Sequence, residues 1–86
     1  MSQVDWAVQM ITRYRTEKNV EKTGVRRLHY WIISQPKEER MIPTRGRGKF
    51  RPFLPKDYNR LSELLVDARI DGLIPFDWIV DEKMSH

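Results

Sequence analysis

Hydrophobic residues recur at helical spacing along much of the chain. In residues 4–18 they stand three and four positions apart, and Ser2 or Gln3 precedes them near the expected helix start. A second stripe covers residues 24–34 and stops before Pro36, because proline disfavours helical geometry in the residue before it. The run "HYWII" inside this stripe is also strand-like, but the flanking periodicity favours a helix.

The third segment, about residues 56–71, has the clearest helical pattern. Gly72 follows it, and glycine is the usual left-handed residue after a helix. The apolar run after Gly72, "LIPFDWIVDE", is expected to form an extended piece and a short helical turn that cover the core. Residues from the second and third stripes and from this run should share one core: Trp31, Leu61, Leu65 and Trp78.

The segment between the second and third stripes is unlike the rest of the chain. "MIPT" and "RPFL" stand on either side of "RGRG" and can pair as a two-stranded hairpin. Pro43 and Pro52 would keep its strands short and at an edge. We therefore predict a single, mainly α domain over residues 1–86, of helix-turn-helix or winged-helix-like type, with a basic loop or short hairpin at about 37–56.

Positive charge is concentrated in this central segment. The chain has 16 basic and 12 acidic residues, a net charge of +4. Between residues 37 and 56, seven basic residues stand against two acidic ones, a balance of +5, whereas the remaining nine basic and ten acidic residues sum to −1. Beyond Asp71 the chain is acidic. This distribution predicts a molecule with one focused positive patch.

The composition of the central loop suits contact with phosphate. Glycine lets the backbone approach a phosphate closely, and the guanidinium fork of arginine matches phosphate oxygens. We predict that Arg45, Arg47, Lys49 and Arg51 each neutralise a phosphate, with duplex DNA as the main partner. Base recognition would need Asn59, Arg60 or Glu63, at the start of the third helix. The predicted nucleic-acid-binding set is Arg45, Arg47, Lys49, Arg51, Lys56, Asn59 and Arg60.

Other functional classes find less support in the sequence. There is no cysteine, so we expect neither disulfides nor a thiolate metal site, and a reducing, cytoplasmic setting is the simplest. The N-terminus does not read as a signal peptide, and no apolar stretch is long enough to cross a membrane. Two isolated histidines, His29 and His86, do not make a metal site. We expect no catalytic residue and no cofactor.

Two stretches of sequence resemble a known family. "VRRLHYWIISQ" and "YNRLSELLVDARIDGLIPFDWIVDE" are similar to the N-terminal, winged-helix-like region of a largely uncharacterised family of phage, plasmid and mobile-element proteins. The second stretch is the more specific. The first also resembles the winged-helix segment of type VI topoisomerase A subunits and of the meiotic break-forming transesterases. In those enzymes a tyrosine at the position of Tyr30 attacks DNA phosphate.

The chain departs from those enzymes in two respects. Arg27 stands where they usually carry an acid, and the 86 residues include no acidic metal-binding domain. The resemblance therefore implies a DNA-binding winged-helix module in which Tyr30 is structural. The basic insert is longer than the corresponding loop of the family, so its role does not carry over. Two alternatives stay open. One is a protein-interaction module encoded by a mobile element, which docks on an acidic partner or dimerises through its aromatic residues. The other is an N-terminal fragment of a larger topoisomerase-like or nuclease-like enzyme.

Overall fold

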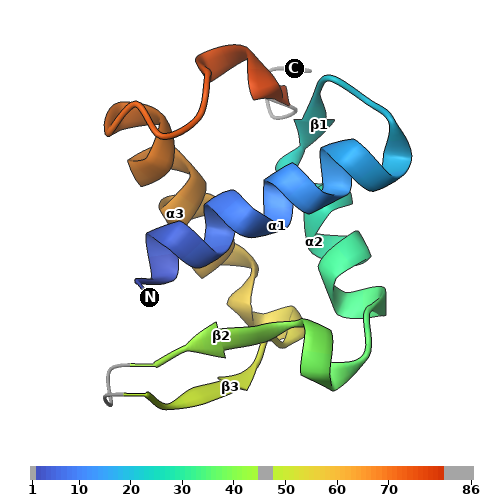
Figure 1. Cartoon of the computed structure of the whole chain (residues 1–86), viewed down its shortest axis with the longest axis vertical. Helices are drawn as coiled ribbons and strands as arrows, with labels where there is room; N and C mark the ends of the chain where they lie inside the picture. Colours follow the sequence, from blue (N-terminus) through green and yellow to red (C-terminus); the bar gives the residue numbers. More distant parts are fainter. Residues whose placement is uncertain (1, 45–47, 81–86) are drawn as a thin grey trace.

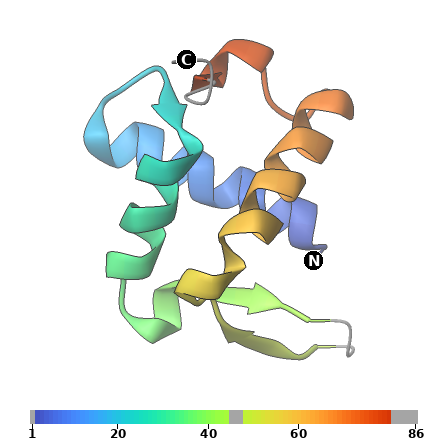
Figure 2. The ribbon, with the colours of Figure 1, turned by 180° about the vertical axis from the view of Figure 1, so that it is seen from behind.

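Three helices make up the body of the protein. The computed structural model describes residues 2–44 and 48–80. Helix α1 spans Gln3–Lys18, α2 spans Val25–Ser34 and α3 spans Tyr58–Ile70. Helix α1 crosses one side of α2 and α3, which run in opposite directions behind it (Figures 1 and 2). The three helices predicted from the hydrophobic pattern are confirmed.

The helix ends follow from local sequence. The hydroxyl of Ser2 accepts a hydrogen bond from the amide of Asp5 at 3.1 Å and so caps the start of α1. At the end of α3, Gly72 adopts a left-handed φ of 75°, as predicted. The amide of Leu73 then donates to the carbonyl of Ala68 at 2.9 Å, which satisfies an acceptor that the helix itself leaves open.

The core lies where the three helices meet. Trp31, Leu61 and Leu65 belong to one buried cluster, and half-buried Trp78 packs against that cluster, which confirms the predicted core. Burial of these apolar surfaces is the main favourable term in folding. The buried helix positions are Trp6, Ala7, Met10 and Ile11 of α1, Leu28, His29, Trp31 and Ile32 of α2, and Leu61, Leu64, Leu65 and Ala68 of α3.

A two-stranded hairpin joins α2 to α3, as the flanks of "RGRG" predicted. Strand β2 spans Met41–Pro43, and β3 spans Phe50–Pro52. They pair antiparallel, with Ile42 opposite Arg51 and Pro43 opposite Phe50. Both prolines therefore sit in three-residue edge strands, where a missing amide donor is tolerated.

A second, smaller strand pair was not predicted. Strand β1 (Thr23–Gly24) pairs in parallel with β4 (Ile79–Val80), which follows a single 3-10 turn at Phe76–Trp78. Ile74 and Ile79 of this final segment are buried. The apolar run after α3 thus covers the core, as expected, and β4 fastens it to the start of α2. In residues 2–44 and 48–80, no helix has the length and apolarity to span a membrane.

The fold predicts that Leu61 of α3 contributes strongly to stability. Leu61 is completely buried, so we expect Leu61→Ala to lower the free energy of unfolding by roughly 2 to 5 kcal/mol, through lost burial and the cavity left behind. Denaturant titration followed by circular dichroism measures the change. Val66→Ala is the matched control on the exposed side of the same helix and should cost less than about 0.5 kcal/mol. Equal effects of the two substitutions would contradict this packing.

Candidate nucleic-acid interface

The hairpin leaves the helical body at one end and extends to one side of it (Figure 1). Near its tip the amide of Thr44 donates to the carbonyl of Lys49 at 2.9 Å. Gly48 has a φ of 69°, which glycine adopts without strain. Arg45 and Arg47, two of the predicted phosphate contacts, connect these strands in sequence but lie outside the described residues.

Three other members of the predicted set are exposed around the hairpin and the start of α3. Lys49 follows the tip, Lys56 lies in the 3-10 turn Pro55–Asp57, and Asn59 lies in the first turn of α3. Neither lysine forms an ion pair with a residue in the described part of the chain. Their charges are therefore open to solvent and to a partner.

The base of the hairpin is held by an aromatic cluster. Phe53, directly after β3, is fully buried and stacks on Trp6 of α1, with ring centroids 5.3 Å apart. His29 of α2 meets the same ring edge-on, at 5.4 Å. Such ring pairs add to the stability that burial alone provides. The hairpin is consequently fixed to two helices at once.

The side chain of Arg40 also stabilises the base of the hairpin, by binding backbone carbonyls. Its guanidinium donates to the carbonyl of Gln35 at 2.9 Å and to the carbonyl of Phe53. In return, the amide of Phe53 donates to the carbonyl of Arg40 at 2.8 Å. The sequence places this arginine within the positive patch, and the structure gives it a role in closing the hairpin.

Arg51 forms a bidentate ion pair with Asp57. Its two terminal nitrogens lie 2.8 and 2.9 Å from the carboxylate oxygens, and the amide of Leu54 donates to the same carboxylate at 2.8 Å. The Asp57 side chain is only 9% exposed and that of Arg51 is 39% exposed. The hydrogen bond from Arg51 holds the pKa of Asp57 below 3.8, against the opposing effect of burial. Arg51, predicted as a phosphate contact, therefore has its fork occupied by a carboxylate.

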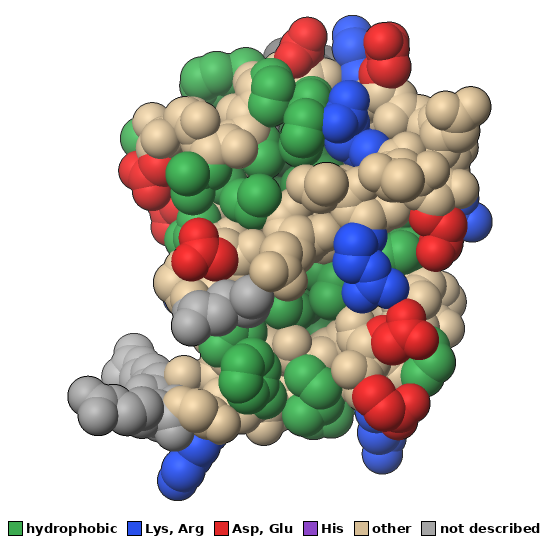
Figure 3. All heavy atoms as spheres, viewed as in Figure 1, with side chains coloured by type: hydrophobic (Ala, Val, Ile, Leu, Met, Phe, Trp, Pro, Cys, Tyr) green, Lys and Arg blue, Asp and Glu red, His purple; other side chains and the backbone are tan. Residues whose placement is uncertain are grey.

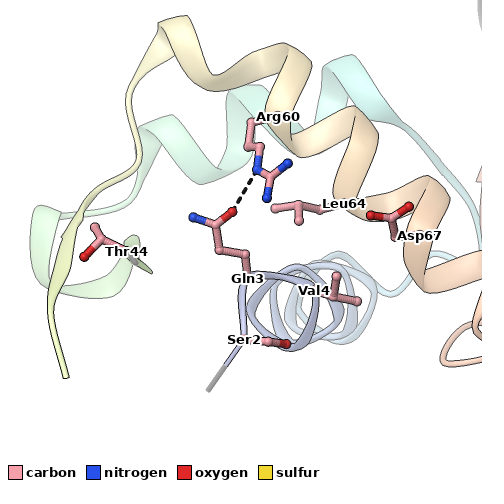
Figure 4. A pocket seen from close by; sticks show the side chains of 7 residues that line it. All are labelled: Ser2, Gln3, Val4, Thr44, Arg60, Leu64 and Asp67. Carbon is pink, nitrogen blue, oxygen red and sulfur yellow. Dashed lines mark hydrogen bonds between the residues drawn. The ribbon is translucent and has the colours of Figure 1, made fainter. Parts of the chain in front are cut away.

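Arg60 is held at the start of α3 by two hydrogen bonds. Its Nε donates to the side-chain oxygen of Gln3 at 2.8 Å, and one terminal nitrogen donates to Glu63 at 3.1 Å (Figure 4). The amide nitrogen of Gln3 in turn donates to the carbonyl of Pro43 at 2.8 Å. Gln3 thus links α1, the hairpin and α3.

An open groove of about 620 Å³ lies beside this link. In Figure 4 the Arg60 guanidinium points towards Gln3 across the groove, and Thr44 stands at the side formed by the hairpin. The groove therefore offers hydroxyl, amide, guanidinium and carboxylate groups beside the hairpin. It is lined by Ser2, Gln3 and Val4 of α1, Thr44 at the end of β2, and Arg60, Leu64 and Asp67 of α3.

His29 is buried among aromatic rings. Besides Phe53 it contacts Tyr58 edge-on, at a centroid distance of 5.1 Å. Its Nδ1 is buried and has no hydrogen-bond partner among the described residues. Burial lowers the pKa of His29 below 6.5, and nearby Asp57 only partly offsets this effect. The ring therefore lies inside the protein.

Tyr30 points away from the core. Its side chain is 63% exposed, and its ring lies 5.7 Å from that of His29. The expectation that Tyr30 is structural receives no support from this position, because little of the side chain is removed from water. Arg26 and Arg27 are exposed on the same helix.

The described residues offer no metal site, and comparisons with known proteins identify no family. In residues 2–44 and 48–80, no cluster of three or more acids or histidines is arranged to hold a metal ion. A scan against protein-family models and searches of curated proteins and of solved structures found no match.

Sequence reasoning missed three residues that shape this interface: Gln3, Arg40 and Asp57. Asp57 has one local signal, because an acid three residues after Leu54 can accept from its amide at the start of a helical turn. Gln3 contacts residues that are far away in the chain, and Arg40 binds backbone carbonyls. No pattern of side-chain types in the sequence predicts either set of contacts.

We expect the Arg51–Asp57 pair to stabilise the fold more than an exposed pair does. Arg51→Met would leave a buried carboxylate with a single described donor, at a cost of about 1 to 3 kcal/mol in the free energy of unfolding. The matched control is Glu39→Gln, which breaks the pair between Arg13 and Glu39, whose side chains are both largely in water. That change should cost less than about 1 kcal/mol. Denaturant titration compares the two, and equal losses would contradict a structural role for Arg51.

His29 should make stability depend on pH. Because its pKa in the folded state lies below 6.5, the unfolded chain takes up a proton first as pH falls. Its contribution to stability is complete above pH 6.5 and is lost as pH falls through the folded-state value. Asp57 produces a separate loss at more acid pH, below 3.8, because its pKa is also lowered.

His29→Phe isolates the first of these effects. Phenylalanine keeps an aromatic ring at this site and removes the buried, unpartnered nitrogen. Thermal unfolding measured from pH 7.5 to 2.5 should show the decline below about pH 6.5 in the parent protein and not in the variant. The acid loss from Asp57 should persist in both. A decline of the same size in the variant would assign it to another group.

Proposed function

We propose that this chain is a small DNA-binding domain of the winged-helix type, in which the β2–β3 hairpin grips the phosphates of duplex DNA. The observation that carries the proposal is the hairpin itself. It extends beyond the helices, its base is fixed in the core, and its strands are joined by the sequence Arg45-Gly46-Arg47 (Figure 1). Because the base of the hairpin is already fixed in the core, binding a polyanion such as DNA would cost little conformational entropy there. The positive charges of the hairpin would then neutralise phosphates.

The start of α3 supports the same assignment. Lys56 and Asn59 are exposed there, and Arg60 faces the groove beside the hairpin. One terminal nitrogen of Arg60 has no hydrogen bond to the described residues, so it is available to a base or phosphate oxygen. Arginine pairs with guanine and asparagine with adenine in the major groove. We therefore assign phosphate contacts to the hairpin and base contacts to Asn59 and Arg60.

The sequence resemblance supports the class of domain. The stretches similar to the winged-helix-like region of mobile-element proteins correspond to α2 and to α3 with the segment after it. The hairpin lies between them, in the position of the long basic insert. In this proposal the insert is the wing.

Arg51 is left out of the phosphate-contacting set. Its terminal nitrogens both bind Asp57, and a phosphate would have to compete with a buried carboxylate for them. Its proposed role is to hold β3 against the start of α3, so that this strand and the base-reading residues keep one geometry.

The salt dependence of DNA binding tests this assignment. In the variant Arg45→Ala/Arg47→Ala/Lys49→Ala about three counterions fewer are released, so the slope of log affinity against log salt should flatten by about 2.7. Affinity should fall similarly on unrelated duplex sequences, since phosphate contacts carry no sequence information. Fluorescence anisotropy with labelled random duplexes at several salt concentrations gives the slope.

The matched control removes the same charge at the opposite end of the molecule. Lys18, Lys22 and Arg26 are exposed around the start of β1 and α2, away from the hairpin (Figure 1). Their replacement by alanine should leave most of the slope intact. If both triple variants lose affinity equally, binding is a non-specific effect of net charge. If the hairpin variant binds like the parent at low salt, an acidic protein becomes the better partner for the hairpin.

A further inference from the structure

The end of α3 remote from the hairpin exposes an unusual amount of apolar surface. Ile70 is 71% exposed, Leu73 48% and Phe76 64%, and all three lie within a few residues of the C-cap of the helix. Large apolar side chains gathered at one place on a small domain often mark an interaction site. We refer to Ile70, Leu73 and Phe76, together with Val8 of α1, as the α3-end surface.

A shallow depression extends this surface onto α1. A groove of about 350 Å³ is lined by Val8 and Leu73, with Asp5 and Gln9 beside them. Figure 3 shows hydrophobic side chains gathered over the turn that follows α3 and the adjoining part of α1, with acidic side chains along their edge. This depression adds a concave area to the exposed apolar side chains.

Acidic residues surround the α3-end surface. Asp5, Asp67, Asp71 and Asp77 are all exposed, and none forms an ion pair with a residue in the described ranges. The two neighbouring arginines are stacked on rings: Arg15 lies 3.7 Å from the Trp78 ring centroid and Arg69 lies 4.6 Å from that of Phe76.

The helix itself adds to the negative potential here. The C-terminal end of a helix carries partial negative charge from its free carbonyls. Asp67 stands in the last turn of α3 and Asp71 is its C-cap, where acids are unfavourable, whereas Arg69 in the same turn is favourably placed. A basic group of a partner beside Asp67 and Asp71 would reduce their repulsion with the negative end of the helix. These two acids therefore favour a basic partner.

From this combination we infer that the α3-end surface docks a segment of a partner protein in which apolar side chains are flanked by lysine or arginine. The apolar groups would fill the groove between Val8 and Leu73 and cover Ile70 and Phe76. The basic groups would meet Asp67, Asp71 and Asp77. A second copy of the same face is a poor occupant, because its acids would meet each other. This inference does not rest on DNA binding, which is proposed for the other end of α3.

Binding of two designed peptides tests the inference. The probe is a fluorescent amphipathic helix of about 18 residues built from leucine and lysine, and its control carries glutamate in place of each lysine. The lysine peptide should bind the whole protein at least about tenfold more tightly at low salt, because only its charges complement the surface. Ile70→Ser/Phe76→Ser should weaken binding about tenfold by removing the apolar contact. Asp67→Asn/Asp71→Asn should weaken binding and reduce its salt dependence.

A control variant and chemical-shift mapping show whether the peptide binds at the α3-end surface. Val20→Ser/Glu21→Gln removes an exposed apolar side chain and an acid in the turn between α1 and β1, and it should leave peptide binding unchanged. Amide chemical shifts should move in residues 66–77 and not in the hairpin. Equal binding of both peptides, or equal loss in the control variant, would overturn the inference. So would a dimer in sedimentation that Phe76→Ser abolishes, because the occupant would then be a second copy.

Discussion

The ring of Phe53 lies where the hairpin meets helices α1 and α2. It follows directly on β3, stacks on Trp6 of α1 and meets His29 of α2 edge-on. Since the ring is fully buried, the base of the hairpin cannot move without opening the core between the helices. The direction in which the hairpin projects therefore depends on this buried side chain, and the Arg51–Asp57 pair fixes the start of α3 relative to it.

The central basic segment divides its charges between two tasks. Arg40 and Arg51 are bound to backbone carbonyls and to the buried carboxylate of Asp57, and they hold the hairpin closed. Lys49 and Lys56 remain exposed. The number of basic residues in this segment is therefore larger than the number available to a partner. Arg40 and Arg51 stabilise the hairpin, and the exposed lysines remain available.

Helix α3 connects two ends of opposite character. Its start carries Asn59 and Arg60 beside a basic hairpin, whereas its end carries Asp67 and Asp71 beside exposed apolar side chains. Arg60 at the start and Asp67 and Asp71 at the end run against the helix dipole, whereas Asp57 at the N-cap and Arg69 in the last turn agree with it. The side chains that oppose the dipole are the ones that the two proposals assign to partners: Arg60 to DNA, and Asp67 and Asp71 to a basic segment.

The residue pattern alone determined the three helices, their apolar faces and the hairpin, because side chains three or four positions apart share a helix face and because prolines and glycines mark where regular structure stops. It also determined that Leu61 and Leu65 are core residues. Only the tertiary structure decided which basic residues are exposed, that His29 is enclosed by rings, and that Gln3 orients Arg60 across 57 positions of sequence. The two-residue strands at Thr23–Gly24 and Ile79–Val80 are too short to show any periodicity. The physical reason is the same in each case: a partner that is distant in the chain is chosen by how the helices pack, and local spacing carries no record of that choice.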